Sequence, residues 1–380
     1  MSFINSQIYD YIFIVGVVLL AACDTDDPAD VSREMEIVVP VTTCWVSDSF
    51  QLKVTFNGEE DETVPVSWSL SDDSKANLGQ NGEILLKKEG QLRLFAQSGD
   101  LSASYELEIK PLRLMYQTAG AEVNAIKSFN WSDGETEILL NNTWESSAPR
   151  ISPDGSMLVF ADTVDAYNSD IFIYKLATAE RFPVASHPLS DDQPVWSSDS
   201  KKIIFRSFRD EGLGCIYAYD LGASSLVNLT PDPVNAAWAN LDPAISPDGK
   251  TMASSNNVNG LHDIWLHNLE TGNRQTAVFT LEYDGEPAWS PDGKKLVFRS
   301  NFSYSPRNAD LVILDLETGS MQRLEIDGIE RQPSWSPNGK YIAFSHELGN
   351  SPPSIRYVDV EKPGELCLIG EHYGYSPVFY

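Results

Sequence analysis

One motif of seven residues recurs along much of the chain and limits what the chain can fold into. It begins with proline and runs into a Ser-Pro-Asp-Gly turn or a variant of it. Its five copies lie at 149–155 (PRISPDG), 194–200 (PVWSSDS), 243–249 (PAISPDG), 287–293 (PAWSPDG) and 333–339 (PSWSPNG). The leading prolines are 45, 49, 44 and 46 residues apart. A period of this length is typical of repeat architectures, in which each copy is one supersecondary unit.

The chemistry of the motif predicts a tight turn followed by a strand. Proline presets φ, aspartate bonds back to the backbone, and glycine tolerates positive φ. Apolar segments such as 295–298 (KLVF) follow the turns. A further strand pattern comes later in each copy, at 170–176, 215–221, 263–269, 310–316 and 354–360. Turns such as 270–272 (ETG) then lead into a fourth strand, and four antiparallel strands make the blade of a β-propeller.

The last residues of the chain predict how the ring of blades closes. Residues 376–380 (SPVFY) begin a further copy, whose proline lies 44 residues beyond Pro333. Strand patterns that complete this copy are found upstream, at 112–118, 123–129 and 137–140. We therefore expect residues 112–380 to form six blades, with the C-terminal strand completing the first blade and leaving no exposed edge.

The motif Pro-x-Trp-Ser-Pro-Asp-Gly, with a later strand that begins Asp-Ile, resembles the WD40-like (PD40) repeat of TolB-type six-bladed propellers. The resemblance extends over residues 112–380. The copy at 194–200 departs from it, because Ser198 and Ser200 replace the proline and the glycine of the turn. The N-terminal α/β domain of TolB has no counterpart in this sequence.

The N-terminus predicts an export signal and a lipid anchor. Residues 11–22 (YIFIVGVVLLAA) are apolar, too few to span a bilayer but of the length of a signal-peptide core. The stretch 20–23 (LAAC) resembles the lipobox of bacterial lipoproteins, which implies a signal peptide at 1–22 and a lipidated Cys23. No Lys or Arg precedes the apolar run, and a buried strand is the alternative interpretation. Residues 23–35 form an acidic tether, so we expect a protein held in a Gram-negative envelope, at the outer membrane.

Residues 36–110 predict a small β-sandwich. Short segments with a period of two, such as 50–56 (FQLKVTF) and 91–96, alternate with turn signals. The succession 66–69 (VSWS), 81–84 (NGEI) and 98–100 (SGD) resembles bacterial Ig-like domains of the Big family, which implies a spacer. Cys44 is the only cysteine of this segment, so we expect no intersheet disulfide and a core held by packing around Trp68.

The charge balance excludes one class of partner. The chain has 55 acidic and 27 basic residues and a formal net charge of −28. A field of this sign repels phosphate backbones, so we expect no nucleic-acid binding. It attracts cations and basic protein surfaces, although plain solvation of the surface is the alternative.

The predicted blade geometry sorts the loops onto two faces. The short Ser-Pro-Asp-Gly and Glu-Thr-Gly turns fall on one face. The longer, varied loops and the blade connections fall on the other, where we expect binding. The candidate binding residues on this long-loop face are Trp238, Tyr304, Phe208, Arg209, Asp242 and Glu286.

Acidic residues concentrate around the predicted channel on the same face: Asp191, Asp192, Asp242, Asp284, Glu286 and Glu330. Calcium takes carboxylate oxygens, so Asp242, Asp284 and Glu286 are the candidate ligands of a structural calcium ion. A solvated acidic rim is the alternative interpretation. Three tryptophans that recur at equivalent strand positions are expected in the core: Trp196, Trp289 and Trp335.

Catalysis finds little support in the sequence. There is no Gly-x-Ser-x-Gly elbow and no glycine-rich phosphate loop, and the five histidines are scattered. We therefore expect a non-enzymatic envelope lipoprotein, without a cofactor beyond the calcium ion, whose propeller binds a protein. One alternative is a glycan receptor with Trp238 and Tyr304 as platforms. Another is a polysaccharide-acting enzyme resembling oligogalacturonate lyase, which would need clustered histidines.

Overall fold

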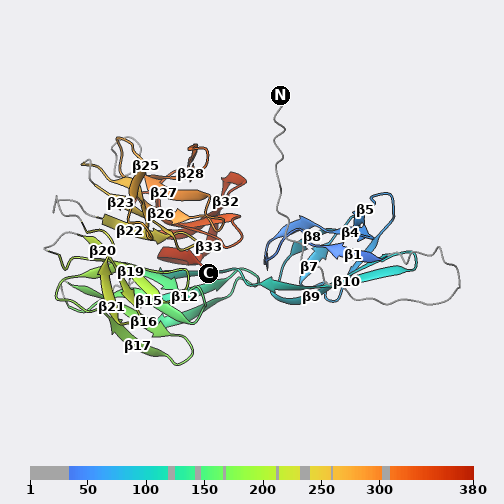
Figure 1. Ribbon diagram of the computed structural model, residues 1–380, viewed down its shortest axis with the longest axis horizontal. Coiled ribbons are helices and arrows are strands. Elements are labelled where there is room, and N and C mark those ends of the chain that lie inside the picture. The colour runs from blue at the N-terminus through green and yellow to red at the C-terminus, as the bar shows by residue number, and fades with distance from the viewer. Residues whose placement is uncertain are drawn as a thin grey trace. The chain divides into compact units, whose positions relative to one another are not determined.

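In the computed structural model the chain consists of strands and connecting loops (Figure 1). The structure describes residues 34–118, 125–141, 147–165, 168–210, 214–231, 240–257, 260–301 and 309–380. Within these ranges we find no helix with the length and apolar character needed to cross a membrane. The chain divides into two compact units, Met1–Pro111 and Leu112–Tyr380.

The first unit contains three small sheets. The first has the order β1 (Met35–Val38), β4 (Lys53–Phe56), β5 (Glu59–Glu60). The second has the order β2 (Cys44–Trp45), β10 (Leu101–Lys110), β9 (Gly90–Ser98), β6 (Ser67–Leu70). The third has the order β3 (Ser49–Gln51), β8 (Glu83–Leu86), β7 (Ala76–Leu78).

Aliphatic side chains hold the core of this unit. Leu92, Leu94 and Ala96 of β9 are buried while the residues between them are exposed, which is the predicted period of two. Trp68 is half-buried, and the fully buried side chains of this core are aliphatic. Cys44 is free, and burial raises the pKa of its thiol to about 12, which keeps it protonated.

The second unit contains four sheets of four strands and one of seven. The first four-stranded sheet has the order β14 (Ser147–Ile151), β15 (Met157–Thr163), β16 (Ser169–Lys175), β17 (Glu180–Val184), and the second β18 (Asp191–Trp196), β19 (Lys202–Ser207), β20 (Cys215–Asp220), β21 (Ser225–Asn228). The third has the order β22 (Asn240–Ile245), β23 (Thr251–Asn256), β24 (Asp263–Asn268), β25 (Arg274–Val278). The fourth has the order β26 (Asp284–Trp289), β27 (Lys295–Ser300), β28 (Asp310–Asp315), β29 (Met321–Leu324). The seven-stranded sheet has the order β13 (Thr136–Asn141), β12 (Ala125–Asn130), β11 (Arg113–Thr118), β33 (Lys362–Phe379), β32 (Ser354–Asp359), β31 (Tyr341–Glu347), β30 (Ile329–Trp335).

Strand β33 joins the two ends of this unit. Its first part pairs with β32, and its last part pairs with β11 in a register that sets Phe379 opposite Leu114. The pairing predicted between the C-terminal residues and 112–118 is therefore present. The first strands contact one another in the order β14, β18, β22, β26, β30 and β33, and β33 in turn contacts β14. The sheets thus form a closed ring.

The turns of the repeat have the geometry that their sequence predicts. Glycine ends four of them with φ between 70° and 73°: Gly155, Gly249, Gly293 and Gly339. In the divergent copy Ser200 takes the same left-handed conformation at φ 59°. Within each turn the first serine donates to the acidic or amide side chain two residues later, as Ser246 Oγ does to Asp248 Oδ1 at 2.5 Å. The serine substitutions therefore leave the backbone path of the turn unchanged.

Two of the three recurring tryptophans lie in the core. Trp196 is 6% exposed and Trp335 is 8% exposed, as expected from their position. Trp289, at the equivalent position of β26, is only half-buried. Trp289 therefore packs against the core, in the cluster that contains Ala253, Ile264 and Leu296, but is not fully buried.

Deleting residues 376–380 should lower the free energy of unfolding by more than ~3 kcal/mol, because the chain loses the buried Phe379 and the pairing that closes the ring. Urea denaturation measures this loss. Tyr380→Phe is the control, since it removes the hydrogen bonds of the Tyr380 hydroxyl, among them that with Ser128 Oγ at 2.6 Å, and should cost about 1–2 kcal/mol. An unchanged midpoint in the deletion would contradict closure by this strand.

Candidate functional site

Six residues with left-handed backbone conformation surround the centre of the ring. Each directly precedes a proline in a first strand, and together we call them the inner belt: Ala148 (φ 52°), Gln193 (52°), Asp242 (54°), Glu286 (55°), Gln332 (53°) and Ser376 (51°). Each interrupts the pairing of its strand at a β-bulge. This conformation costs a non-glycine residue roughly 1–2 kcal/mol, so contacts around the belt must stabilise it.

Those contacts are hydrogen bonds from one sheet to the next. Gln193 Oε1 accepts from the Asp242 N–H at 2.9 Å, and Asp242 Oδ2 accepts from the Glu286 N–H at 3.2 Å. The Glu286 carboxylate accepts from the Gln332 N–H, and Gln332 Oε1 accepts from the Ser376 N–H at 2.8 Å. Belt side chains thus satisfy backbone donors that the bulges release from strand pairing.

The two carboxylates of the belt, those of Asp242 and Glu286, are close enough for their charges to interact. Burial, followed by the negative charge of Glu286, raises the pKa of Asp242 to about 7. Gln193 Nε2 donates to Asp242 Oδ1, and Arg299 Nη1 lies 3.6 Å from Glu286 Oε1. The pair therefore changes its total charge near neutral pH.

Arginines and aromatic rings lie beside these carboxylates. Arg206 forms a bidentate ion pair with Asp192, and its guanidinium lies over the Phe208 ring at 4.8 Å. Arg299 lies 5.3 Å from the centre of the Tyr283 ring. Burial and the nearby carboxylates raise the pKa of Tyr283, so its hydroxyl stays protonated. These groups form a half-buried set of fixed charges and rings.

A narrow cavity of about 280 Å³ lies at the axis of the ring. One residue from each first strand lines it: Arg150, Val195, Ala244, Ala288, Ser334 and Val378. Arg150 is the charged member of this set, and its Nη1 donates to the Pro149 carbonyl at 2.9 Å. Desolvation lowers the pKa of Arg150 to about 10, and Asp242 opposes the shift. The channel is therefore positively charged next to the acidic part of the belt.

Three of the acidic residues expected at the rim are fully buried. Asp191, Asp284 and Glu330 each have 0% exposure, so a solvated rim is wrong for them. Asp191 pairs with Arg209 at 2.9 Å, and Asp284 accepts from Thr280 Oγ1 at 2.6 Å. Sequence reasoning missed their burial, although all three stand three residues before the proline of a first strand, a position internal to the ring.

Glu330 is the least compensated of these groups. Neither of its carboxylate oxygens meets a hydrogen-bond partner within the described residues, and His346 Nε2 lies 3.6 Å from Oε1. The same nitrogen is 2.8 Å from the Asp327 carbonyl, to which it can donate. Burial, with the charge of Asp310 second, raises the pKa of Glu330 to about 8. Glu330 is therefore a neutral acid at pH 7.

The candidate binding residues separate in the structure. Phe208, Asp242 and Glu286 lie in the set described above. Arg209 is 14% exposed and tied inward, because it donates to Ser207 Oγ, to the Ala185 carbonyl and to Asp191. The remaining candidates lie outside the described residues: Trp238, Tyr304 and Cys23.

The three proposed calcium ligands do not form one cluster. Asp242 and Glu286 are neighbours, whereas the charged neighbours of Asp284 are Asp263 and Glu282. Over the described ranges no group of three or more His, Cys, Asp or Glu side chains is placed to hold a metal ion. The belt carboxylates instead accept backbone N–H groups.

Glu330→Gln should make the fold less sensitive to pH. The folded chain holds a proton on Glu330 up to about pH 8, whereas an unfolded glutamate releases it near 4.5, so stability falls as pH rises through this window. Between pH 5 and pH 8 the difference in unfolding free energy between the variant and the parent should shift in favour of the variant by about 3–4 kcal/mol. Urea denaturation at both pH values measures this. The exposed Glu325→Gln is the control, and an equal pH dependence in Glu330→Gln and the parent would exclude a neutral Glu330.

Comparison with known proteins supports the fold. Residues 231–379 match the family model described as the TolB beta propeller domain. An uncharacterised protein of Agrobacterium fabrum is 26% identical over 179 residues, which are 46% of this chain and 59% of that protein. The uncharacterised peptidase YuxL of Bacillus subtilis is 24% identical over 196 residues, 41% of this chain and 29% of the peptidase. The chain thus spans less than two thirds of either relative.

Solved structures extend the likeness over most of the chain. TolB of Acinetobacter baumannii superposes with a TM-score of 0.64 at 17% identity, covering 83% of this chain and 82% of TolB. A putative TolB of Agrobacterium tumefaciens gives a TM-score of 0.57 at 16% identity, covering 70% of this chain and 89% of that TolB. A chain of a nidogen/laminin complex gives a TM-score of 0.55 at 11% identity, covering 70% of this chain and 98% of that chain. The second unit therefore has the fold of a TolB-like β-propeller.

Proposed function

We propose that this protein is a non-enzymatic cell-envelope lipoprotein whose propeller is a scaffold for a protein partner. In this proposal β33 divides the seven-stranded sheet into two blades, which makes six blades in all, one for each belt residue. The first unit serves as an Ig-like spacer between the membrane anchor and the propeller. The lipobox-like stretch 20–23 supports the anchor.

The observation that carries the proposal is the set of paired arginines and aromatic rings beside the channel. Arg206 and Asp192 retain 18% and 20% exposure while paired, and Arg206 also covers Phe208. Arginine and aromatic side chains supply much of the binding energy in protein interfaces, above all where they are held in place before binding. The belt fixes the backbone that carries them.

The use of the titratable groups supports a scaffold over an enzyme. Asp242 and Glu286 accept backbone N–H groups of neighbouring sheets. Asp191 pairs with Arg209 and Asp284 accepts from Thr280 through one carboxylate oxygen each, while the other oxygen of each has no hydrogen-bond partner within the described residues. The paired oxygens stabilise the ring. A chain of the nidogen/laminin complex is an example of this fold in an assembly of proteins.

Phe208→Ala should weaken capture of the envelope partner by roughly tenfold or more, because it removes a ring from the proposed interface. The full chain and its variants are immobilised, and the protein recovered from envelope extract is quantified by mass spectrometry. Val227→Ala is the control, since Val227 is 57% exposed on the outer strand β21, away from this set. Equal recovery with Phe208→Ala and Val227→Ala would contradict binding at this face.

Cys23→Ser should move the protein from the membrane to the soluble fraction, because a thioether-linked lipid cannot form on serine. Fractionation of cells that produce the two forms, followed by immunoblotting, measures this. Ser49→Ala, in the folded first unit, is a control that should stay with the membrane. Retention of the Cys23→Ser protein in the membrane would contradict the anchor.

A further inference from the structure

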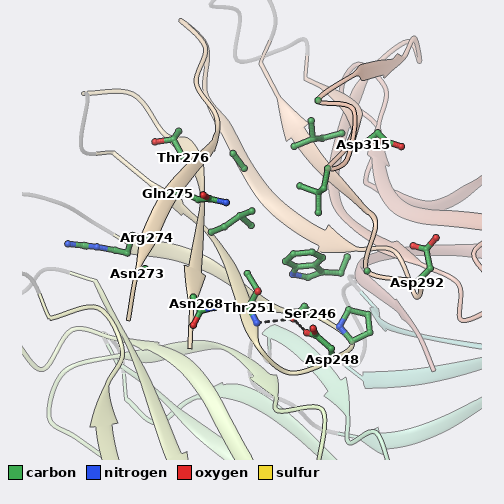
Figure 2. Close-up of a pocket in the computed structure, with 18 of the residues that line it drawn as sticks. Ser246, Asp248, Thr251, Asn268, Asn273, Arg274, Gln275, Thr276, Asp292 and Asp315 are labelled. Carbon is green, nitrogen blue, oxygen red and sulfur yellow. Dashed lines mark hydrogen bonds between the residues drawn. The ribbon is translucent and has the colours of Figure 1, made fainter. Parts of the chain in front are cut away.

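A groove of about 910 Å³ lies between the β22–β25 sheet and the β26–β29 sheet (Figure 2). The short turns that contain Asp248 and Asp292 line one end of it, and β25 lines its outer side. It therefore opens on the short-turn face, away from the long loops. Its volume is that of a small-molecule site.

The equivalent space between the β14–β17 and β18–β21 sheets holds two apolar side chains, Phe182 and Met157, which pack against the core. Phe182 pairs with Ile173 of β16, and Gln275 pairs with Leu266, the corresponding residue of β24. Met157 pairs with Lys175 and Thr251 pairs with Asn268, so Thr251 stands at the position of Met157. The groove therefore has two polar side chains where this other pair of sheets has apolar ones.

The tryptophan that borders the groove is less buried than its counterpart. Trp196 is 6% exposed in the core cluster against which Phe182 and Met157 pack, whereas Trp289 is half-buried. The Trp289 Nε1 donates to the Ala244 carbonyl at 3.1 Å, and this bond fixes the indole. The carbon surface of the ring is then the part available to a ligand in the groove.

Polar groups surround the ring. Asp292 and Asp315 each accept turn hydrogen bonds at Oδ1, and these bonds hold their pKa values below the usual range. Both carboxylates are therefore ionised acceptors at neutral pH. Gln275 and Thr276 are exposed on β25 and add an amide and a hydroxyl. The groove thus combines one fixed aromatic surface with acceptors and donors at its edges.

We propose that this groove binds a neutral oligosaccharide. A pyranose ring offers a C–H face that packs on an indole and hydroxyls that donate to carboxylates and exchange hydrogen bonds with amides. The ionised Asp248, Asp292 and Asp315 outnumber Arg274 among the lining residues, and this balance disfavours acidic sugars and phosphorylated ligands. This site is independent of the protein-binding face, so the protein would hold a glycan and a protein partner at opposite ends of the ring.

Titration calorimetry of the full chain with cellotetraose, maltotetraose and chitotetraose tests the proposal. At least one should bind with a Kd of about 1 mM or tighter. The double variant Thr251→Met with Gln275→Phe copies the packing around Trp196 and should weaken this binding at least ~10-fold while keeping the thermal midpoint. Gln322→Phe is the matched control, because Gln322 has the same position in β29 and does not line the groove.

A second variant tests sugar binding without adding large side chains that could change the packing around Trp289. Gln275→Ala with Thr276→Ala removes exposed polar groups only and should weaken binding at least ~3-fold. The proposal is overturned if none of the three sugars binds, if the filled variant binds as the parent does, or if tetragalacturonate or pentalysine binds while the neutral sugars do not. Loss of sugar binding with intact capture of the protein partner supports two separate sites.

Discussion

The ring depends on four hydrogen bonds that pass from sheet to sheet through the inner belt, from Gln193 to Ser376. A bulge before proline turns one residue of the first strand into the left-handed region and leaves its N–H without a strand partner. A side-chain oxygen of the preceding belt residue accepts that N–H, as Gln332 does for Ser376. At these four steps strain and unpaired donors are compensated together by a side chain with an acceptor oxygen, which Ala148 lacks.

This requirement explains the acidic residues at the centre of the molecule. Asp242 and Glu286 are belt acceptors first, and their charge then has to be balanced in a poorly solvated place. Arg299 lies near Glu286, and the positive charges of Arg206 and Arg150 interact with the carboxylate of Asp242. The cluster of charges and rings beside the channel follows from the way the ring is closed.

The sequence alone predicts the frame of the propeller well. The spacing of the turn motif and the truncated copy at 376–380 predict the sheets, the short turns and the pairing of β33 with β11. It does not predict the belt, because a residue before proline is expected in the extended region. Nor does it predict the burial of Glu330 or the exposure of Trp289, since each depends on which side chains the adjacent sheet supplies.

Trp289 shows how one repeat can produce either a packed contact or a site. The backbone at the Trp196 and Trp289 positions is the same, and both indoles donate to the carbonyl of the preceding sheet. Phe182 packs against the core cluster that contains the first ring, whereas its counterpart beside the second ring is Gln275, which lines the groove. A polar residue at this position does not by itself open a groove, because Gln322 occupies it in β29 and Trp335 of the next sheet is only 8% exposed. The groove therefore depends on all the side chains that two adjacent sheets supply, and a site can arise at one pair of sheets while the backbone repeat stays the same.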